Sequence, residues 1–186
     1  MPLTPPSDRE LIHTRTITCE GYEREDGLFD IDGWLTDAKT YDFTSTDRGD
    51  VKAGVPVHGM GLRITIDAGL NIRAAAVAMD HTPFNMCPSI TPNFQRLVGL
   101  NLGKGFNGAV REALGGTQGC VHLVDLLRPM ANTAYQLLSP NAYKALKDKE
   151  ARGEPVTAFF INQCHAWTSD GEVTRDQFPS HYTGEA

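Results

Sequence analysis

The sequence predicts an α+β fold, in which helices pack on one face of an antiparallel sheet of at least four strands. Two observations carry this prediction. Residues 13–80 are strand-rich and alternate with a period of two, whereas after Cys87 the apolar residues recur at about 3.6 residues, the helical period. Because the strands come first and the helices follow, separate layers are favoured over a β-α-β alternation.

Two β-hairpins are expected in the first half of the chain. Asp26-Gly27 is typical of a tight hairpin turn, and Ala68-Gly69 marks a second turn. In the second hairpin, apolar residues alternate with polar ones, so one face is expected to be wet. The four expected strands are residues 13–22, 28–37, 57–67 and 71–79.

Helices are expected over residues 88–153. Thr91-Pro92 starts the first as a cap followed by proline, and Pro129 is expected to kink or break the third. The expected helices begin at Thr91, span Phe106–Leu114, begin near Gly119, and run from Ser139-Pro140 to Gly153. Residues 154–186 are expected to hold a strand, Val156–Trp167, and a polar tail.

Length and charge bound the class of protein. The 186 residues predict one domain over 1–186, and the 17 basic against 23 acidic residues form no basic run, so nucleic acid is excluded. Apolar stretches such as Ala74–Met79 are too short for a membrane span. The N-terminus lacks the basic and apolar regions of a signal peptide, so we expect a soluble cytoplasmic protein with reduced thiols.

Three candidate metal ligands lie at the ends of expected elements. His58 opens the third strand, Cys87 lies between the fourth strand and the first helix, and Cys120 lies where a Gly-rich loop becomes a helix. Sites are commonly built at such positions, and these three soft ligands could meet there. The structural alternatives are buried thiols and a strand-end histidine that donates to a carbonyl.

His122 is a candidate catalytic residue. It lies two residues beyond Cys120, about 200° away on a regular helix, so it is expected to act as a general base and to bind a metal only if the helix starts later. Adjacent Cys164 and His165 are expected to face opposite sides of a strand, and Cys19 is expected in the core. The alternative for His122 is a histidine on the helix surface.

Several segments resemble the bacterial domain-of-unknown-function family 2889 (DUF2889) over nearly the whole chain. The resemblance names no activity. The family more often has Asp after the histidine, where this chain has Gly59. The segments that carry the resemblance are Arg9–Arg15, Gly21–Gly27, Leu35–Tyr41, Pro56–Met60 and Leu114–Leu123.

A more distant resemblance, over residues 54–138, is to the iron–sulfur scaffolds and zinc-binding sulfur acceptors of the IscU and SufU type. It rests on the order of Pro-x-His58, two strands, Cys87 and Gly119-Cys120 at the start of a long helix. The resemblance implies that His58, Cys87 and Cys120 converge on one metal or cluster. The Asp ligand of the scaffolds would fall near Met60 and has no counterpart.

Together these observations favour a metal-dependent hydrolase or lyase with one Zn²⁺ or Fe²⁺ per chain and a small-molecule substrate. A small organic acid or aromatic compound of bacterial catabolism is expected from the family alone. The alternatives are a noncatalytic iron–sulfur or sulfur-transfer scaffold, and a metal-free enzyme with Cys120 as nucleophile. Self-association into a homo-oligomer stays open.

Overall fold

The computed structural model describes residues 3–103 and 105–185 and divides the chain into two compact units, residues 1–135 and 136–186. The prediction of one domain concerns independent folding, which this division does not test. The first unit contains the long strands β1 (His13–Glu23), β2 (Phe29–Lys39), β5 (Pro56–Ile66) and β6 (Ile72–His81).

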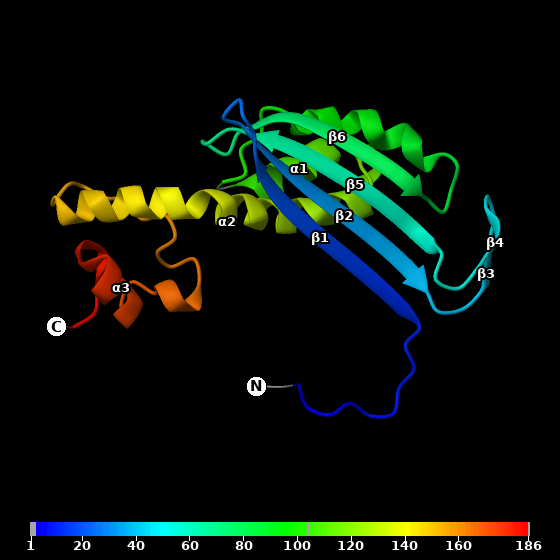
Figure 1. Ribbon diagram of the computed structural model, residues 1–186, viewed down its shortest axis with the longest axis horizontal. Helices are drawn as coiled ribbons and strands as arrows, with labels where there is room; N and C mark the ends of the chain where they lie inside the picture. Colours follow the sequence, from blue (N-terminus) through cyan, green and yellow to red (C-terminus); the bar gives the residue numbers. More distant parts are fainter. Residues whose placement is uncertain (1–2, 104, 186) are drawn as a thin grey trace. The chain divides into compact units, whose positions relative to one another are not determined.

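The four long strands form one antiparallel sheet in the order β1-β2-β5-β6 (Figure 1). The fold class and both hairpins are therefore confirmed. At the first turn Gly27 adopts a φ of 79°, which glycine tolerates at no steric cost. The segment expected to be only a polar connection contains two further short strands, β3 (Phe43–Ser45) and β4 (Gly49–Val51), which pair with each other.

One face of the sheet forms the core. Ile31 and Leu35 on β2, together with Leu62 and Ile64 on β5, are almost fully buried, whereas Trp34 on the opposite face is 42 % exposed. This alternation is the period of two in the sequence, since successive strand residues point to opposite faces.

The helical segments of the first unit are η1 (Cys87–Leu97), α1 (Phe106–Leu114), η2 (Gly116–Gln118) and the start of α2 (Val121–Ala151). The first of these differs from expectation, because it begins at Cys87 rather than Thr91 and is a 3₁₀ helix that includes Pro92. The N-terminal half of α2 packs against the sheet, where Gly33 lets Leu126 and Met130 approach the backbone of β2.

The helix α2 is continuous, whereas a kink or break at Pro129 and a new helix at Ser139-Pro140 were expected, so the break and the new helix are wrong. Proline removes one backbone donor, but burial compensates for that loss. Leu126, Met130 and Ala134 recur every four residues on the buried side, on both sides of Pro129. Packing of this apolar stripe keeps the helix intact at Pro129.

The second unit contains the C-terminal part of α2 together with η3 (His165–Trp167), α3 (Glu172–Gln177) and η4 (Pro179–His181). The expected strand over Val156–Trp167 is wrong. Its aromatic residues, which suggested a strand, instead pack in a cluster around fully buried Phe178, with Phe160 at 5.4 Å and Trp167 at 5.9 Å between ring centroids. Within the described residues, no helix combines the length and apolar character needed to cross a bilayer.

Substitution of Gly33 tests the packing of α2 on β2. A Cβ atom there would lie 2.6 Å from Met130 Sδ and 2.9 Å from Met130 Cγ, so Gly33→Ala should destabilise the protein by about 1–3 kcal/mol. Met130→Ala alone should cost about 2–5 kcal/mol through the cavity that it leaves. The double variant should lose less stability than the sum of the losses in the two single variants, as measured by denaturant unfolding.

Gly108→Ala is the matched control, because Gly108 lies in α1 with nothing within 4 Å of the added Cβ. Helix propensity predicts that this change is neutral or stabilising by up to about 1 kcal/mol. Strictly additive costs for Gly33→Ala and Met130→Ala would contradict the packing described here.

Candidate functional site

A row of polar side chains crosses three strands on the core face of the sheet. Arg15 on β1 lies opposite Asp37 on β2, and Asp37 lies opposite His58 on β5. Residues directly opposite in an antiparallel sheet point to the same face. The strand register therefore brings together three residues that are more than twenty positions apart in sequence.

Asp37 is the centre of this row and is only 3 % exposed. Arg15 donates to both carboxylate oxygens, from Nε to Oδ1 and from Nη2 to Oδ2, each at 2.9 Å. His13 Nε2 lies 3.1 Å from Oδ1, and His58 Nδ1 lies 3.0 Å from Oδ2. Both oxygens of the buried carboxylate are thus satisfied by groups from the two neighbouring strands.

The Asp37 carboxylate is held in its ionised form. Burial acts to raise the pKa of Asp37, but the hydrogen bonds and positive charge of Arg15, together with the hydrogen bond from His58, outweigh burial and hold that pKa below its usual value. Arg15 Nη1 also donates to Asp125 Oδ2 on α2, at 3.1 Å. The guanidinium therefore connects the sheet to the helix beside the site.

The strand register shifts immediately after Asp37, where a bulge separates it from Ala38. Bulges are common beside functional sites, because they end or redirect strand pairing. His58 comes close to the start of β5, so the row lies where the β2–β5 ladder ends rather than in its middle. The imidazole of His58 remains 15 % exposed, and that of His13 is 47 % exposed, so the row is open to solvent on the side of β1.

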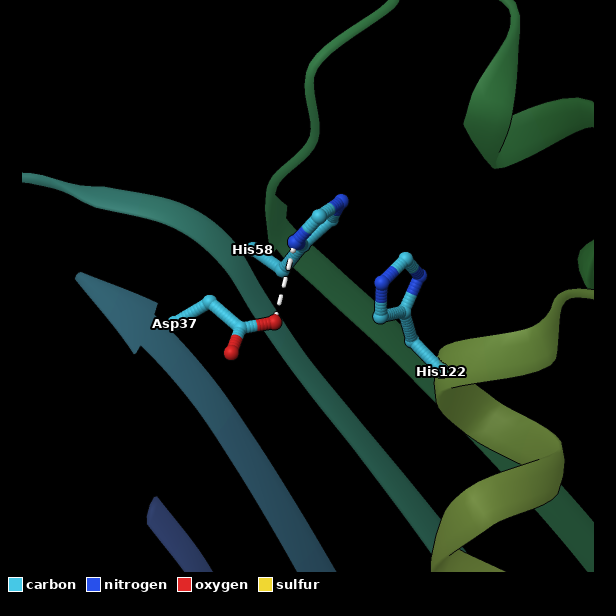
Figure 2. A group of neighbouring side chains, drawn as sticks. All are labelled: Asp37, His58 and His122. Carbon is cyan, nitrogen blue, oxygen red and sulfur yellow. Dashed lines mark hydrogen bonds and ion pairs between the residues drawn. The ribbon is translucent and has the colours of Figure 1, made fainter. Parts of the chain in front are cut away.

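His122 approaches this row from α2. Its ring stacks on that of His58, with centroids 3.7 Å apart and an interplanar angle of 29°. Figure 2 shows Asp37 bonded to one side of the His58 ring, while the His122 ring lies beside it on the helix. Because His58 Nδ1 faces Asp37, its Nε2 is the nitrogen left for another partner.

Both imidazoles favour the neutral form. Burial lowers the pKa of His58, and nearby His122 lowers it further, although Asp37 opposes these effects. Burial also lowers the pKa of His122, and the positive charge of Arg15 adds to this. Neutral imidazole is the form that binds a metal or accepts a proton.

Asp37, His58 and His122 form a group whose donor atoms all lie within 4.8 Å of one another. Within residues 3–103 and 105–185, no other set of three His, Cys, Asp or Glu residues meets this condition. The structure thus brings predicted ligand His58 together with predicted base His122, and it adds Asp37. The predicted set of His58, Cys87 and Cys120 does not form such a group.

Cys120 nevertheless lies close to the site. Its Sγ is 3.9 Å from His122 Nδ1 and 4.0 Å from Met60 Sδ. The backbone carbonyl of Cys120 accepts a hydrogen bond from the N–H of Val124. Cys120 is therefore the N-cap residue, immediately before the first residue of α2. The argument from the helical wheel that Cys120 and His122 point apart therefore does not hold.

The remaining candidate residues lie elsewhere. Cys87 is half-buried at the start of η1. Cys19 is also half-buried rather than in the core, because β1 is an edge strand. Cys164 is exposed and precedes η3 in the second unit, so it and His165 do not lie on a strand.

The glycines of the loop before Cys120 have a steric explanation. A Cβ on Gly115 would meet the carbonyl oxygen of Arg111, and a Cβ on Gly119 would meet that of Leu114. Glycine therefore allows the chain to fold back against the end of α1. Close packing of the loop therefore explains both glycines.

The sequence analysis missed Asp37 and Arg15 as site residues. The hairpin turn contained the signal, because Arg15 and Asp37 are equally far along the chain from Asp26 and so lie opposite each other once the turn is fixed. Nothing local showed that the third strand would place His58 beside Asp37. That pairing depends on how the two hairpins join.

Comparison with known families identifies the first unit. The family model described as "Protein of unknown function (DUF2889)" matches residues 13–136, and the chain belongs to this family. The match ends one residue after the division between the two units and includes every residue of the Asp37–His58–His122 group. No curated protein and no solved structure matches the chain.

The lowered pKa values of His58 and His122 predict a pH-dependent stability. Since each pKa lies below 6.5 in the folded chain and near 6.5 in the unfolded chain, the unfolded state binds more protons between these values. The free energy of unfolding should therefore fall as the pH drops below about 6.5. Urea unfolding of chelator-treated protein between pH 8 and 5 measures this.

The double variant His58→Gln/His122→Gln should lose this pH dependence over the same range. His165→Gln should keep it, because His165 is exposed in the second unit. An equal loss of stability with falling pH in the wild type and in the double variant would refute the assignment.

Proposed function

We propose that this chain is a metal-dependent enzyme, a hydrolase or lyase, whose site is the Asp37–His58–His122 group. The observation that supports the proposal most strongly is that the two neutral imidazoles lie together beside a buried carboxylate, with one donor atom of each residue within 4.8 Å of the others. The substrate would be a small organic acid or aromatic compound, an expectation that comes from the family resemblance. The four free thiols suit a reducing, cytoplasmic compartment.

The donor set fits a borderline-soft divalent ion such as Zn²⁺ or Fe²⁺. His58 would bind through Nε2, since its Nδ1 is bonded to Asp37, and His122 is neutral and stacked beside it. Asp37 already has four donors on its two oxygens, so it serves as the carboxylate that orients His58. Cys120, beside His122, is the nearest thiol that could complete the set.

In this proposal the metal would polarise a substrate carbonyl or lower the pKa of a bound water. The chain's own residues hold and orient the reacting groups. Asp37 fixes the tautomer and ring position of His58, and Arg15 keeps Asp37 ionised by neutralising part of its charge. In this proposal His122 is a metal ligand, whereas in a proton-transfer role the metal would be held without it.

Variants distinguish these roles of His122. His58→Ala and His122→Ala should each lose the metal from protein purified without chelator, because two ligands are too few to hold a divalent ion tightly. Asp37→Asn should lower metal affinity by about 10- to 100-fold, since the amide no longer fixes His58 electrostatically. Elemental analysis and competition with a chromophoric chelator provide the measurements.

His165→Ala, in the second unit, is the control and should retain the metal. Retention of the metal by His122→Ala, with turnover reduced by about 10²-fold or more, would make His122 the proton-transfer residue. If neither histidine variant changes the metal content, the proposal fails. Cys87→Ser addresses the ligand set expected from the sequence, and we expect it to keep the metal.

A scaffold for iron–sulfur clusters or sulfur transfer stays the alternative from a different class. It would need His58, Cys87 and Cys120 to converge, and the described residues contain no such group. Reconstitution with iron and sulfide gives visible absorption if a cluster forms, whereas a zinc site is colourless. Visible absorption that depends on both Cys87 and Cys120 would replace the enzyme proposal.

A metal-free site is supported by one specific contact, the 3.9 Å between Cys120 Sγ and His122 Nδ1. His122 would then activate the thiol as a nucleophile. The histidine oriented by Asp37 is His58, however, and two stacked rings exchange no hydrogen bond through their faces. If metal-stripped protein is active and the Cys120→Ser substitution abolishes that activity, this alternative is favoured.

A further inference from the structure

The strand β1 has one free edge. All eleven residues, His13–Glu23, pair with β2 without a register shift. In an antiparallel pair alternate residues bond to the neighbouring strand, and the others point their backbone groups outward. Within residues 3–103 and 105–185, no hydrogen bond reaches the outward backbone groups of β1.

The opposite edge of the sheet is protected. On β6, Ile72 exchanges backbone hydrogen bonds with Leu100 and Gly99, and the side chain of Gln95 donates to the carbonyl of Ala75. The pairing of β6 with β5 also shifts register twice. These features are typical of natural protection of an edge strand.

Within the described part of the chain, β1 has no such backbone contacts and no bulge, and it lacks proline and lysine, although Arg15, Glu20 and Glu23 give it charge. It extends about 36 Å at the usual rise per residue. Ile17 and Tyr22 on it are 40 % and 47 % exposed. A long, regular and unprotected edge of this kind is a template for pairing with another strand.

We propose that β1 pairs with β1 of a second copy of this chain, antiparallel about a twofold axis at Thr18. Thr18 is the middle residue, so this register alone uses all eleven residues on both strands, and backbone bonding favours it over shorter pairings. The result is a continuous eight-stranded sheet.

The side chains of β1 are complementary to themselves in this register. His13 of one copy lies opposite Glu23 of the other, at both ends of the ladder, and Ile17 lies opposite Cys19 at the centre. Arg15 lies opposite Gly21, and Glu20 opposite Thr16, so no like charges face each other. The exposed area of Ile17 and Tyr22 would be covered.

The pairing also extends the candidate site. His13 Nε2 contacts Asp37 Oδ1, and its imidazole is 47 % exposed at the side of β1. Glu23 of the second copy would lie beside this imidazole and add a carboxylate to the edge of the site. This consequence rests on the proposed function, whereas the pairing itself does not.

Disulfide trapping tests the register. In a Cys19→Ser/Cys164→Ser background, which removes the exposed thiol of Cys164, Thr18→Cys should form a dimer on mild oxidation, since only residue 18 faces its own copy and opposed Cα atoms lie at disulfide distance. Thr16→Cys and Glu20→Cys should each fail to cross-link alone but should cross-link when mixed. Self-cross-linking of Thr16→Cys, or no dimer with Thr18→Cys, would overturn the proposal.

Sedimentation tests the dimer without oxidation. The wild type should sediment as a dimer, and Thr18→Glu should weaken association at least tenfold, because two carboxylates would meet on the axis. Thr18→Gln is the neutral control and should leave association unchanged. A wild type that is monomeric at all concentrations, or equal effects of Glu and Gln, would refute the pairing.

The metal content of Thr18→Glu separates this proposal from the proposed function. Residue 18 lies on the sheet face opposite the site, so the monomeric variant should keep its metal. Loss of the dimer with metal retained is the expected result. A dimeric protein that binds no metal would contradict only the function.

Discussion

The buried carboxylate of Asp37 is the interaction on which the site depends. It needs compensation, because an ionised group at 3 % exposure is costly unless it is paired and hydrogen-bonded. Arg15 and His13 on one neighbouring strand, and His58 on the other, supply that compensation. The same contacts fix which nitrogen of His58 is turned away from Asp37. The contacts of Asp37 with its two neighbouring strands therefore stabilise this end of the sheet and also fix the geometry of the site.

Much of the fold could be predicted from the sequence, because its signals are local. The Asp26-Gly27 turn and the alternation in β5 gave both hairpins, and α1 was predicted with the bounds that the structure shows. The errors share a cause, since tertiary packing overrode local signals. Burial kept α2 helical through Pro129, and the aromatic residues after Val156 packed around Phe178 instead of forming a strand.

The candidate site was predictable only in part. His58 was identified as a candidate because it opens a strand, and His122 because it follows Cys120 by two residues. Asp37 occupies a core-facing position of its strand, and the first hairpin places it opposite Arg15, but nothing local places it beside His58. Its importance comes from the β2–β5 register and from the bulge beside it. Sequence periodicity does not predict contacts between segments that are distant in sequence.

The charge balance at Asp37 also bears on what the site can bind. A free carboxylate beside two imidazoles would attract any divalent ion, hard or soft. Here Arg15 donates hydrogen bonds to both carboxylate oxygens and offsets much of their charge, so the neutral nitrogens of His58 and His122 would be the better metal ligands. Imidazole nitrogen favours Zn²⁺ or Fe²⁺ over Mg²⁺ or Ca²⁺. In the proposed metal site Arg15 would thus influence which ion binds without contacting it, and its ion pair with Asp125 links it to α2.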